Sequence, residues 1–162
     1  MPDGITIRTA DPGDAEALTH LHLDCWDDAY TGLMPQSILD ARREDVPARI
    51  TRWRRVLANG HTSVAVRAGQ LVGFINAAPG TEVPGAELQL FALYVRAAWW
   101  GTGVGRALLS AAVGDQPAYL WVLEGNARAI RFYERQGFRL DGTGHDEPEG
   151  RHVRMVRRVH QP

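Results

Sequence analysis

The chain has 162 residues and a formal net charge of −1 at pH 7, from 18 basic and 19 acidic side chains. This length suits a single domain spanning residues 1–162. The near-neutral balance excludes a global preference for nucleic acid or for an anionic membrane. Every basic residue is an arginine, which excludes a Schiff-base lysine and the lysine of a Walker phosphate loop.

Cys25 is the single cysteine of the sequence and cannot form an internal disulfide. A reducing compartment is therefore the default. The first residues lack the apolar run of a signal peptide, and no apolar run approaches the roughly 20 residues that span a bilayer. We expect a soluble cytoplasmic protein.

The first half of the chain predicts one strand followed by helices. Residues 5–9 alternate as a short strand, and the next helix opens with Asp11 as its cap and Pro12 in its first turn. After a break at residues 32–35, one helical region runs from about residue 35 to Asn59-Gly60.

The second half alternates strands and helices. Two β-rich runs around residues 68–70 form a hairpin, and a glycine- and proline-rich loop follows. The remaining predicted elements are a strand at 86–95, a helix to about 113, a strand at 118–122, a helix at 126–136 and a final strand at 151–160, with room for one more strand. This mixed order predicts an α/β fold.

The strand at residues 86–95 changes phase within its length. Leu88 and Leu90 keep one alternation, whereas Phe91, Leu93 and Val95 keep the opposite one. A β-bulge causes such a slip of one residue. A strand buried on both faces would also lose its alternation, so both interpretations stay open.

Three glycines at alternate positions, Gly101, Gly103 and Gly105, stand immediately before a helical pattern. The spacing does not match a dinucleotide fingerprint, and a P-loop would need a lysine. Glycines here allow a ligand to approach the backbone where the helix begins, and the exposed amides would face an anion. The alternative is a tight strand-to-helix turn with no ligand.

The segments "LYVRAAWWGTGVGRALL" (residues 93–109) and "NARAIRFYERQGF" (residues 126–138) resemble the acetyl-CoA signature of the GNAT superfamily of N-acetyltransferases. The resemblance implies a single α+β domain, with a mixed, mostly antiparallel sheet that is splayed between strands 4 and 5 and flanked by helices. It also implies direct transfer of the acetyl group of acetyl-CoA to a primary amine of a small molecule or peptide.

The same resemblance implies which residues hold coenzyme A. The loop amides would hold the pyrophosphate, the fourth strand would pair with the pantetheine arm, and Asn126 would bond that arm from the far side. The implied residues are Leu93, Tyr94, Val95, Arg96, Gly101, Thr102, Gly103, Val104, Gly105, Arg106, Asn126 and Tyr133. Trp100 departs from the family pattern, which usually has Arg or Gln there, and should lose a polar contact.

Acetyl transfer requires a neutral amine and a protonated leaving thiolate. Tyr133 is the predicted acid, since a phenol can donate a proton to a thiolate. The amide of Leu93 is a candidate to polarise the thioester carbonyl. Relatives often carry a glutamate where this chain has Gln89, so Glu87, two residues earlier, and Glu124 are the candidate bases.

The acceptor site is predicted from the aromatic residues Trp26 and Tyr30. Gln89 and the candidate bases Glu87 and Glu124 are predicted to complete it. The arginines around Trp53 are interpreted as a solvated helix face, so we expect no nucleic acid partner, and no metal site is predicted. The alternating final strand offers an edge for a homodimer. The alternative function is a catalytically weak, CoA-binding regulatory module, which Gln89 and Trp100 favour.

Overall fold

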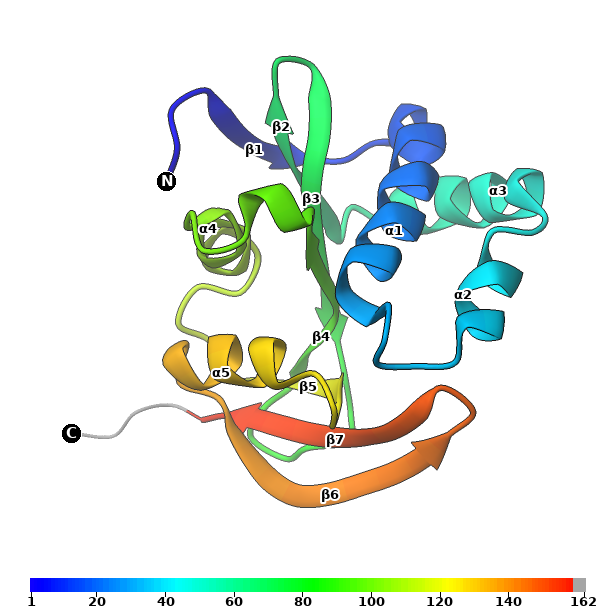
Figure 1. The fold of residues 1–162 in the computed structure, drawn as a ribbon. Coiled ribbons are helices and arrows are strands. Elements are labelled where there is room, and N and C mark those ends of the chain that lie inside the picture. Colours follow the sequence, from blue (N-terminus) through cyan, green and yellow to red (C-terminus); the bar gives the residue numbers. More distant parts are fainter. Residues whose placement is uncertain (159–162) are drawn as a thin grey trace.

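In the computed structural model, which describes residues 1–158, a seven-stranded sheet separates two groups of helices (Figure 1). The strands are β1 (Ile5–Thr9), β2 (Thr62–Arg67), β3 (Gln70–Pro79), β4 (Leu88–Val95), β5 (Ala118–Leu123), β6 (Arg139–Glu147) and β7 (Gly150–Arg157). The helices are α1 (Ala15–Tyr30), α2 (Gln36–Arg42), α3 (Val46–Leu57), α4 (Val104–Ala112) and α5 (Ala127–Arg135).

The sheet has the strand order β1-β2-β3-β4-β5-β7-β6. Each neighbouring pair is antiparallel except β4 and β5, which run parallel. A parallel pair needs a crossover, and α4 supplies it. The fold class predicted from the sequence is confirmed.

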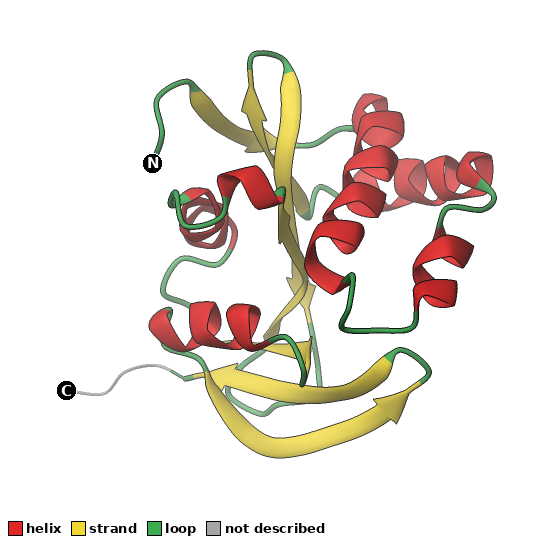
Figure 2. Cartoon of the chain, in the orientation of Figure 1, coloured by secondary structure: helices red, strands yellow, loops and turns green. Residues whose placement is uncertain are grey.

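The helices cover the two faces of the sheet separately (Figure 2). On one side α4 and α5 bury Leu108 and Tyr133 in the larger core, together with Phe138 after α5. On the other side α1 and α3 pack on β2 and β3 around Leu18 and Phe74. Each helix therefore presents one apolar face to the sheet.

The phase slip in β4 is a bulge. Asn76 of β3 pairs with Ala92, but the next residue, Ala77, pairs with Leu90, which leaves Phe91 as the extra residue. The Phe91 side chain is 55% exposed. Beyond Leu90, β4 makes no further pairs with β5 in the described chain, so the two strands diverge there. The predicted bulge and splay are both confirmed.

Three local features differ from the sequence-based expectation. The helical region predicted over residues 35–60 is two helices, because Asp45 breaks it with φ +51° and caps α3 through a hydrogen bond from Ala48 N. The additional strand is β6, whose residues are nearly all exposed, so burial leaves no alternating pattern. The predicted final strand ends at Arg157, and residues 159 and 160 lie outside the described part.

The premise of a homodimer through the last strand is wrong. β7 lies inside the sheet, between β5 and β6, so its backbone is already paired on both sides.

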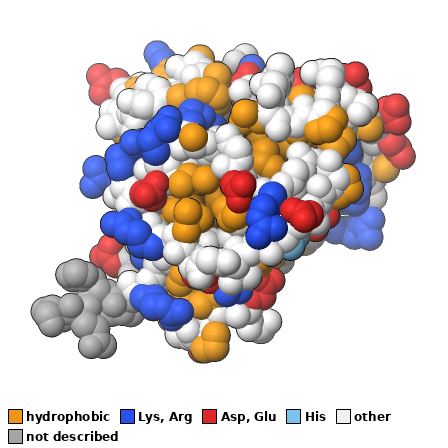
Figure 3. All heavy atoms as spheres, turned by 60° about the horizontal axis from the view of Figure 1, so that its bottom comes forward, with side chains coloured by type: hydrophobic (Ala, Val, Ile, Leu, Met, Phe, Trp, Pro, Cys, Tyr) orange, Lys and Arg blue, Asp and Glu red, His pale blue; other side chains and the backbone are white. Residues whose placement is uncertain are grey.

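On the face shown in Figure 3, basic and acidic side chains are interspersed among apolar ones. Within residues 1–158, none of the helices is long and apolar enough to cross a membrane.

Candidate active site

A cavity of about 610 Å³ opens where β4 and β5 diverge. Its walls come from β4, from the glycine turn with the start of α4, from β5 and α5, and from the last turn of α1. The backbone of β4 is unpaired along this wall, because β5 pairs only with Leu88–Leu90. An extended ligand can therefore lie along β4 in the place of a strand.

The glycine turn forms one end of the cavity. Gly101 and Gly103 adopt φ values of +72° and +94°, which side-chain-bearing residues rarely adopt. Gly103 is the N-cap of α4, and no side chain caps this helix. The first amides of α4 therefore lack acceptors from a cap, and a helix N-terminus attracts an anion.

The other residues of this turn have separate roles. Gly105 and Arg106, in the first turn of α4, line the cavity. Thr102 lies outside the cavity wall and donates its hydroxyl hydrogen bond to the carbonyl of Trp99. The side chain of Val104 is buried in the larger core, which holds the start of α4 against the sheet.

Alternate residues of β4 direct their backbone groups into the cavity. Arg96 N donates to Val72 O of β3, so the alternation of an antiparallel strand turns Leu93 and Val95 away from β3. Both residues and Tyr94 line the cavity. This leaves the backbone N–H and C=O of Leu93 available to a ligand.

Trp100 replaces the expected polar side chain with contacts inside the protein. Its indole Nε1 donates to the carbonyl of Val95 at 2.8 Å. The guanidinium of Arg128 stacks on its ring, 3.6 Å from the centroid. The indole thus bridges β4 and α5 at the cavity wall, and it partly occupies the Val95 carbonyl that the family resemblance assigned to the pantetheine arm.

Two residues of α5 approach the cavity from the side opposite β4. Asn126 is the N-cap, and its Oδ1 accepts from Ala129 N at 3.2 Å, which leaves the N–H donors of its amide for a ligand. Tyr133, two turns later, is buried and lines the same cavity. Burial raises the pKa of Tyr133 above its ordinary value, so the phenol keeps its proton.

A pair of tyrosines meets at the α1 side of the cavity. The hydroxyls of Tyr30 and Tyr94 lie 2.8 Å apart. Burial raises the pKa of both phenols, so both stay neutral near pH 7. The pair offers neutral hydrogen-bonding groups and no carboxylate at this position.

The comparisons with known proteins agree with this geometry. The model of the acetyltransferase (GNAT) family matches residues 16–138. A Mycobacterium tuberculosis protein named "Probable N-acetyltransferase" is 30% identical over 146 residues, which cover 87% of this chain and 83% of that protein. The chain belongs to the GNAT family of acetyltransferases.

Two further similarities place this GNAT chain among its relatives. The mycothiol acetyltransferase of Salinispora tropica is 32% identical over 85% of this chain, but the match covers only 46% of that longer protein. The crystal structure of the PaiA N-acetyltransferase of Thermoplasma acidophilum, in complex with coenzyme A, has a TM-score of 0.75 at 22% identity. That match covers 95% of this chain and 98% of the other, so nearly the whole chain shares the fold of that N-acetyltransferase.

Several residues assigned from the sequence lie outside the GNAT cavity. Arg96, expected to support phosphate binding, donates instead to Asp28 Oδ2 at 2.7 Å. Trp26 is stacked under Arg42, whose guanidinium carbon is 3.4 Å from the ring centroid. Of the predicted aromatic pair, only Tyr30 lines the cavity.

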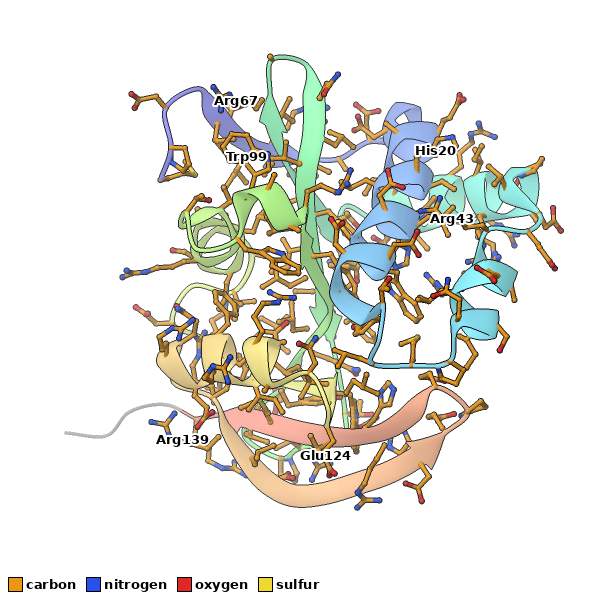
Figure 4. The ribbon with its side chains drawn as sticks, viewed as in Figure 1. His20, Arg43, Arg67, Trp99, Glu124 and Arg139 are labelled. Carbon is orange, nitrogen blue, oxygen red and sulfur yellow. The ribbon has the colours of Figure 1, made fainter. Side chains whose placement is uncertain are left out.

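None of the three residues considered for the base position lines the cavity. Glu87 is exposed and precedes β4. Gln89 accepts a hydrogen bond from Tyr119 at 2.9 Å. Glu124 lies beside β7, with its N–H bonded to Arg151 O and its carboxylate 3.5 Å from the guanidinium of the same arginine (Figure 4).

Sequence reasoning did not assign several residues of the wall, among them Trp99, Ala129 and Phe132. Ala129, Phe132 and Tyr133 share the apolar face of α5, at helical spacing. That spacing was the available signal for the two α5 residues. Trp99 carried no such signal, because it lies in a single turn, Ala97–Trp99, that faces the cavity only in the folded chain.

Proposed function

We propose that this enzyme binds acetyl-CoA in the cavity between β4 and β5 and transfers the acetyl group to a primary amine of a small molecule or a peptide. One observation carries the proposal: a single cavity extends from the uncapped N-terminus of α4 to the hydroxyl-bearing residue Tyr133, along the edge of β4 that β5 leaves unpaired. A diphosphate with a long amide-containing arm matches that sequence of groups.

The residues present fit coenzyme A. The amides that follow Gly103 suit the diphosphate, and Arg106 adds a positive charge at that end of the cavity. The backbone of Leu93 and the amide of Asn126 face the cavity from opposite sides and suit the amides of the pantetheine arm. A helix N-terminus alone contributes about 0.3 to 1 kcal/mol, so the strand contacts must supply much of the affinity.

The transfer requires one bond to form and one to break. The neutral amine nitrogen attacks the thioester carbonyl carbon, the C–S bond breaks, and the sulfur leaves as a thiolate that takes up a proton. The amide of Leu93 is the proposed donor to the carbonyl oxygen, where negative charge develops. The hydroxyl of Tyr133 is the proposed donor to the sulfur, because its raised pKa keeps it protonated.

The amine must lose a proton before it attacks, and no Asp or Glu is among the described residues that line the cavity. We therefore propose that the acceptor loses its ammonium proton to bulk water and enters as the neutral amine. After the attack its nitrogen releases a second proton to water, and Tyr133 recovers from water the proton that it donates to the sulfur. Holding the amine and the thioester in attack geometry can provide roughly 7 to 11 kcal/mol. A side-chain base contributes less, because its typical rate increase of 10²- to 10⁴-fold corresponds to only about 3 to 5 kcal/mol.

The purified protein, incubated with acetyl-CoA and a panel of primary amines, is expected to release thiol faster than without amine. The panel should contain polyamines, aminoglycosides, amino acids and peptides, and mass spectrometry should find the acetylated product. Calorimetry with coenzyme A is the parallel measurement. Binding without any acetylated amine would contradict the proposal and would favour a CoA-binding regulatory module.

The pH dependence of kcat/KM should follow the pKa of the acceptor amine and not the pKa of any side chain in the cavity. For a given amine, kcat/KM is expected to rise about tenfold per pH unit up to the pKa of that amine, and two amines of different pKa should give two displaced profiles. Tyr133 should cause no fall near pH 10, because its pKa is raised. An inflection at the same pH between 5 and 8 for both amines would instead indicate a side-chain base.

A further inference from the structure

A second, smaller cavity of about 330 Å³ lies on the α1 and α3 side of the β4 bulge. Its walls include His22 of α1, Arg49, Arg52 and Trp53 of α3, and Phe91 at the bulge. Two of these wall residues are cations, and none is a carboxylate. The sequence interpretation of this part of α3 as a solvated helix face does not account for a cavity.

The arginines of this region make no ion pair within the described part of the chain. None of the ion pairs found in residues 1–158 involves Arg42, Arg49 or Arg52. The Nε atoms of Arg42 and Arg49 are buried without a hydrogen-bond partner. Burial lowers the pKa of Arg49, and the neighbouring charge of Arg52 lowers it further. Asp45 opposes this effect, but it makes no ion pair with Arg49.

Arg42, outside the cavity wall, contacts His22, which is part of it. Arg42 Nη2 lies 3.4 Å from His22 Nε2, and Arg42 stacks on Trp26. Burial lowers the pKa of His22 to about 3, with Arg42 and Arg49 adding to the effect, so the imidazole is neutral. Because it is neutral, His22 neither adds to nor offsets the positive charge of the arginines.

The second cavity adjoins the active site. Phe91 and Ala92 line both cavities. The ring of His22, in the second cavity, lies 5.6 Å from the ring of Tyr94, in the first. A molecule seated against Arg49 can therefore extend over the bulge toward the Tyr30 and Tyr94 hydroxyls.

We propose that the second cavity binds an oxyanion, a carboxylate or a phosphate group, carried by the amine acceptor. Arg49 and Arg52 are the proposed donors, because a planar guanidinium fits such a group with two parallel hydrogen bonds. The anion would compensate the unpaired charges of the arginines, and the amine of the same molecule would reach the thioester past Phe91. This inference rests on the proposed amine acetylation and specifies the class of its acceptor.

The binding test uses coenzyme A-loaded protein, which cannot turn over. Calorimetry compares 5-aminopentanoate with pentylamine, and phosphoethanolamine with ethanolamine. At least one anionic amine is expected to bind about tenfold or more tightly than its partner, as a charge-assisted hydrogen bond allows. Arg49→Gln and Arg52→Gln should each reduce that preference, whereas Arg55→Gln, on the exposed side of α3, should retain it.

The kinetic test uses the same amines with acetyl-CoA. The favoured anionic amine should have a kcat/KM about tenfold or more above its partner. Arg49→Gln should raise its KM and leave the KM for acetyl-CoA unchanged. The preferred pair also identifies the group, carboxylate or phosphate, that the cavity selects.

Two results would overturn the inference: equal affinities within both amine pairs, or an anion preference that survives the Arg49→Gln and Arg52→Gln double substitution. A different result would concern the proposed function alone. If no amine is acetylated although acetyl-CoA binds, amine acetylation is what fails, and the calorimetric comparison still decides whether the anion site exists.

Discussion

Replacing Tyr133 with phenylalanine is expected to lower kcat by about 10²- to 10⁴-fold, since the departing thiolate would lose its proposed proton donor. Affinity for coenzyme A should stay within about twofold, a change of under 1 kcal/mol, because the ring of Tyr133 remains packed against Phe132 and Phe138. Steady-state kinetics with a confirmed acceptor, together with calorimetry, provide the measurement.

Tyr119→Phe is the matched control for this substitution. Tyr119 is also buried, but its hydroxyl bonds Gln89 and Glu82 N outside the active-site cavity. The control should lose about 1 kcal/mol of stability with little change in kcat. An unchanged kcat in Tyr133→Phe would remove Tyr133 from the reaction and leave it a packing residue.

Replacing Gly101 with alanine is expected to weaken coenzyme A binding by about tenfold or more, a loss of at least 1.4 kcal/mol. Gly101 has φ +72°, where a side chain costs about 1 to 2 kcal/mol. Relief of that strain would also shift the turn and with it the amides after Gly103 that are proposed to hold the diphosphate. Calorimetry gives the affinity, and thermal unfolding gives the cost in stability.

Gly69→Ala is the matched control, because it introduces a similar backbone strain at a position outside the proposed coenzyme A site. Gly69, in the turn between β2 and β3, has φ +78°, and as at Gly101 an added Cβ would meet no atom within 4 Å. Both substitutions should therefore cost similar stability. Only Gly101→Ala should weaken coenzyme A binding, and equal affinities in the two variants would contradict the proposed diphosphate site.

The local sequence predicted the features that depend on backbone conformation. The phase slip around Phe91 predicted the bulge, since alternation within a strand reports which face each residue occupies. The alternate glycines predicted an anion-accessible turn because only glycine readily adopts the positive φ values found at Gly101 and Gly103. The additional strand for which the sequence left room, β6, could not be located in advance because its residues are nearly all exposed and no burial pattern marks them.

Side-chain partners were harder to predict than backbone shape. Spacing put Glu87 on the same strand face as Gln89, but β4 starts only at Leu88 and the cavity begins farther along, at Leu90. At Trp100 the departure from the family pattern predicts a lost polar contact with the ligand, but it gave no sign that the indole bonds Val95 O and stacks against Arg128. Each of these outcomes depends on residues distant in the chain.

The sequence by itself determined the family, the order of most strands and helices, the bulge in β4 and the glycine turn that begins α4, because these depend on local backbone preferences and on motifs of neighbouring residues. Only the tertiary structure decided that the predicted bases lie outside the cavity and that Arg49 and Arg52 of α3 lie beside the bulge of β4. The physical reason is that an electrostatic site is made by charges that folding brings together or leaves unpaired, and separation along the chain does not encode those distances.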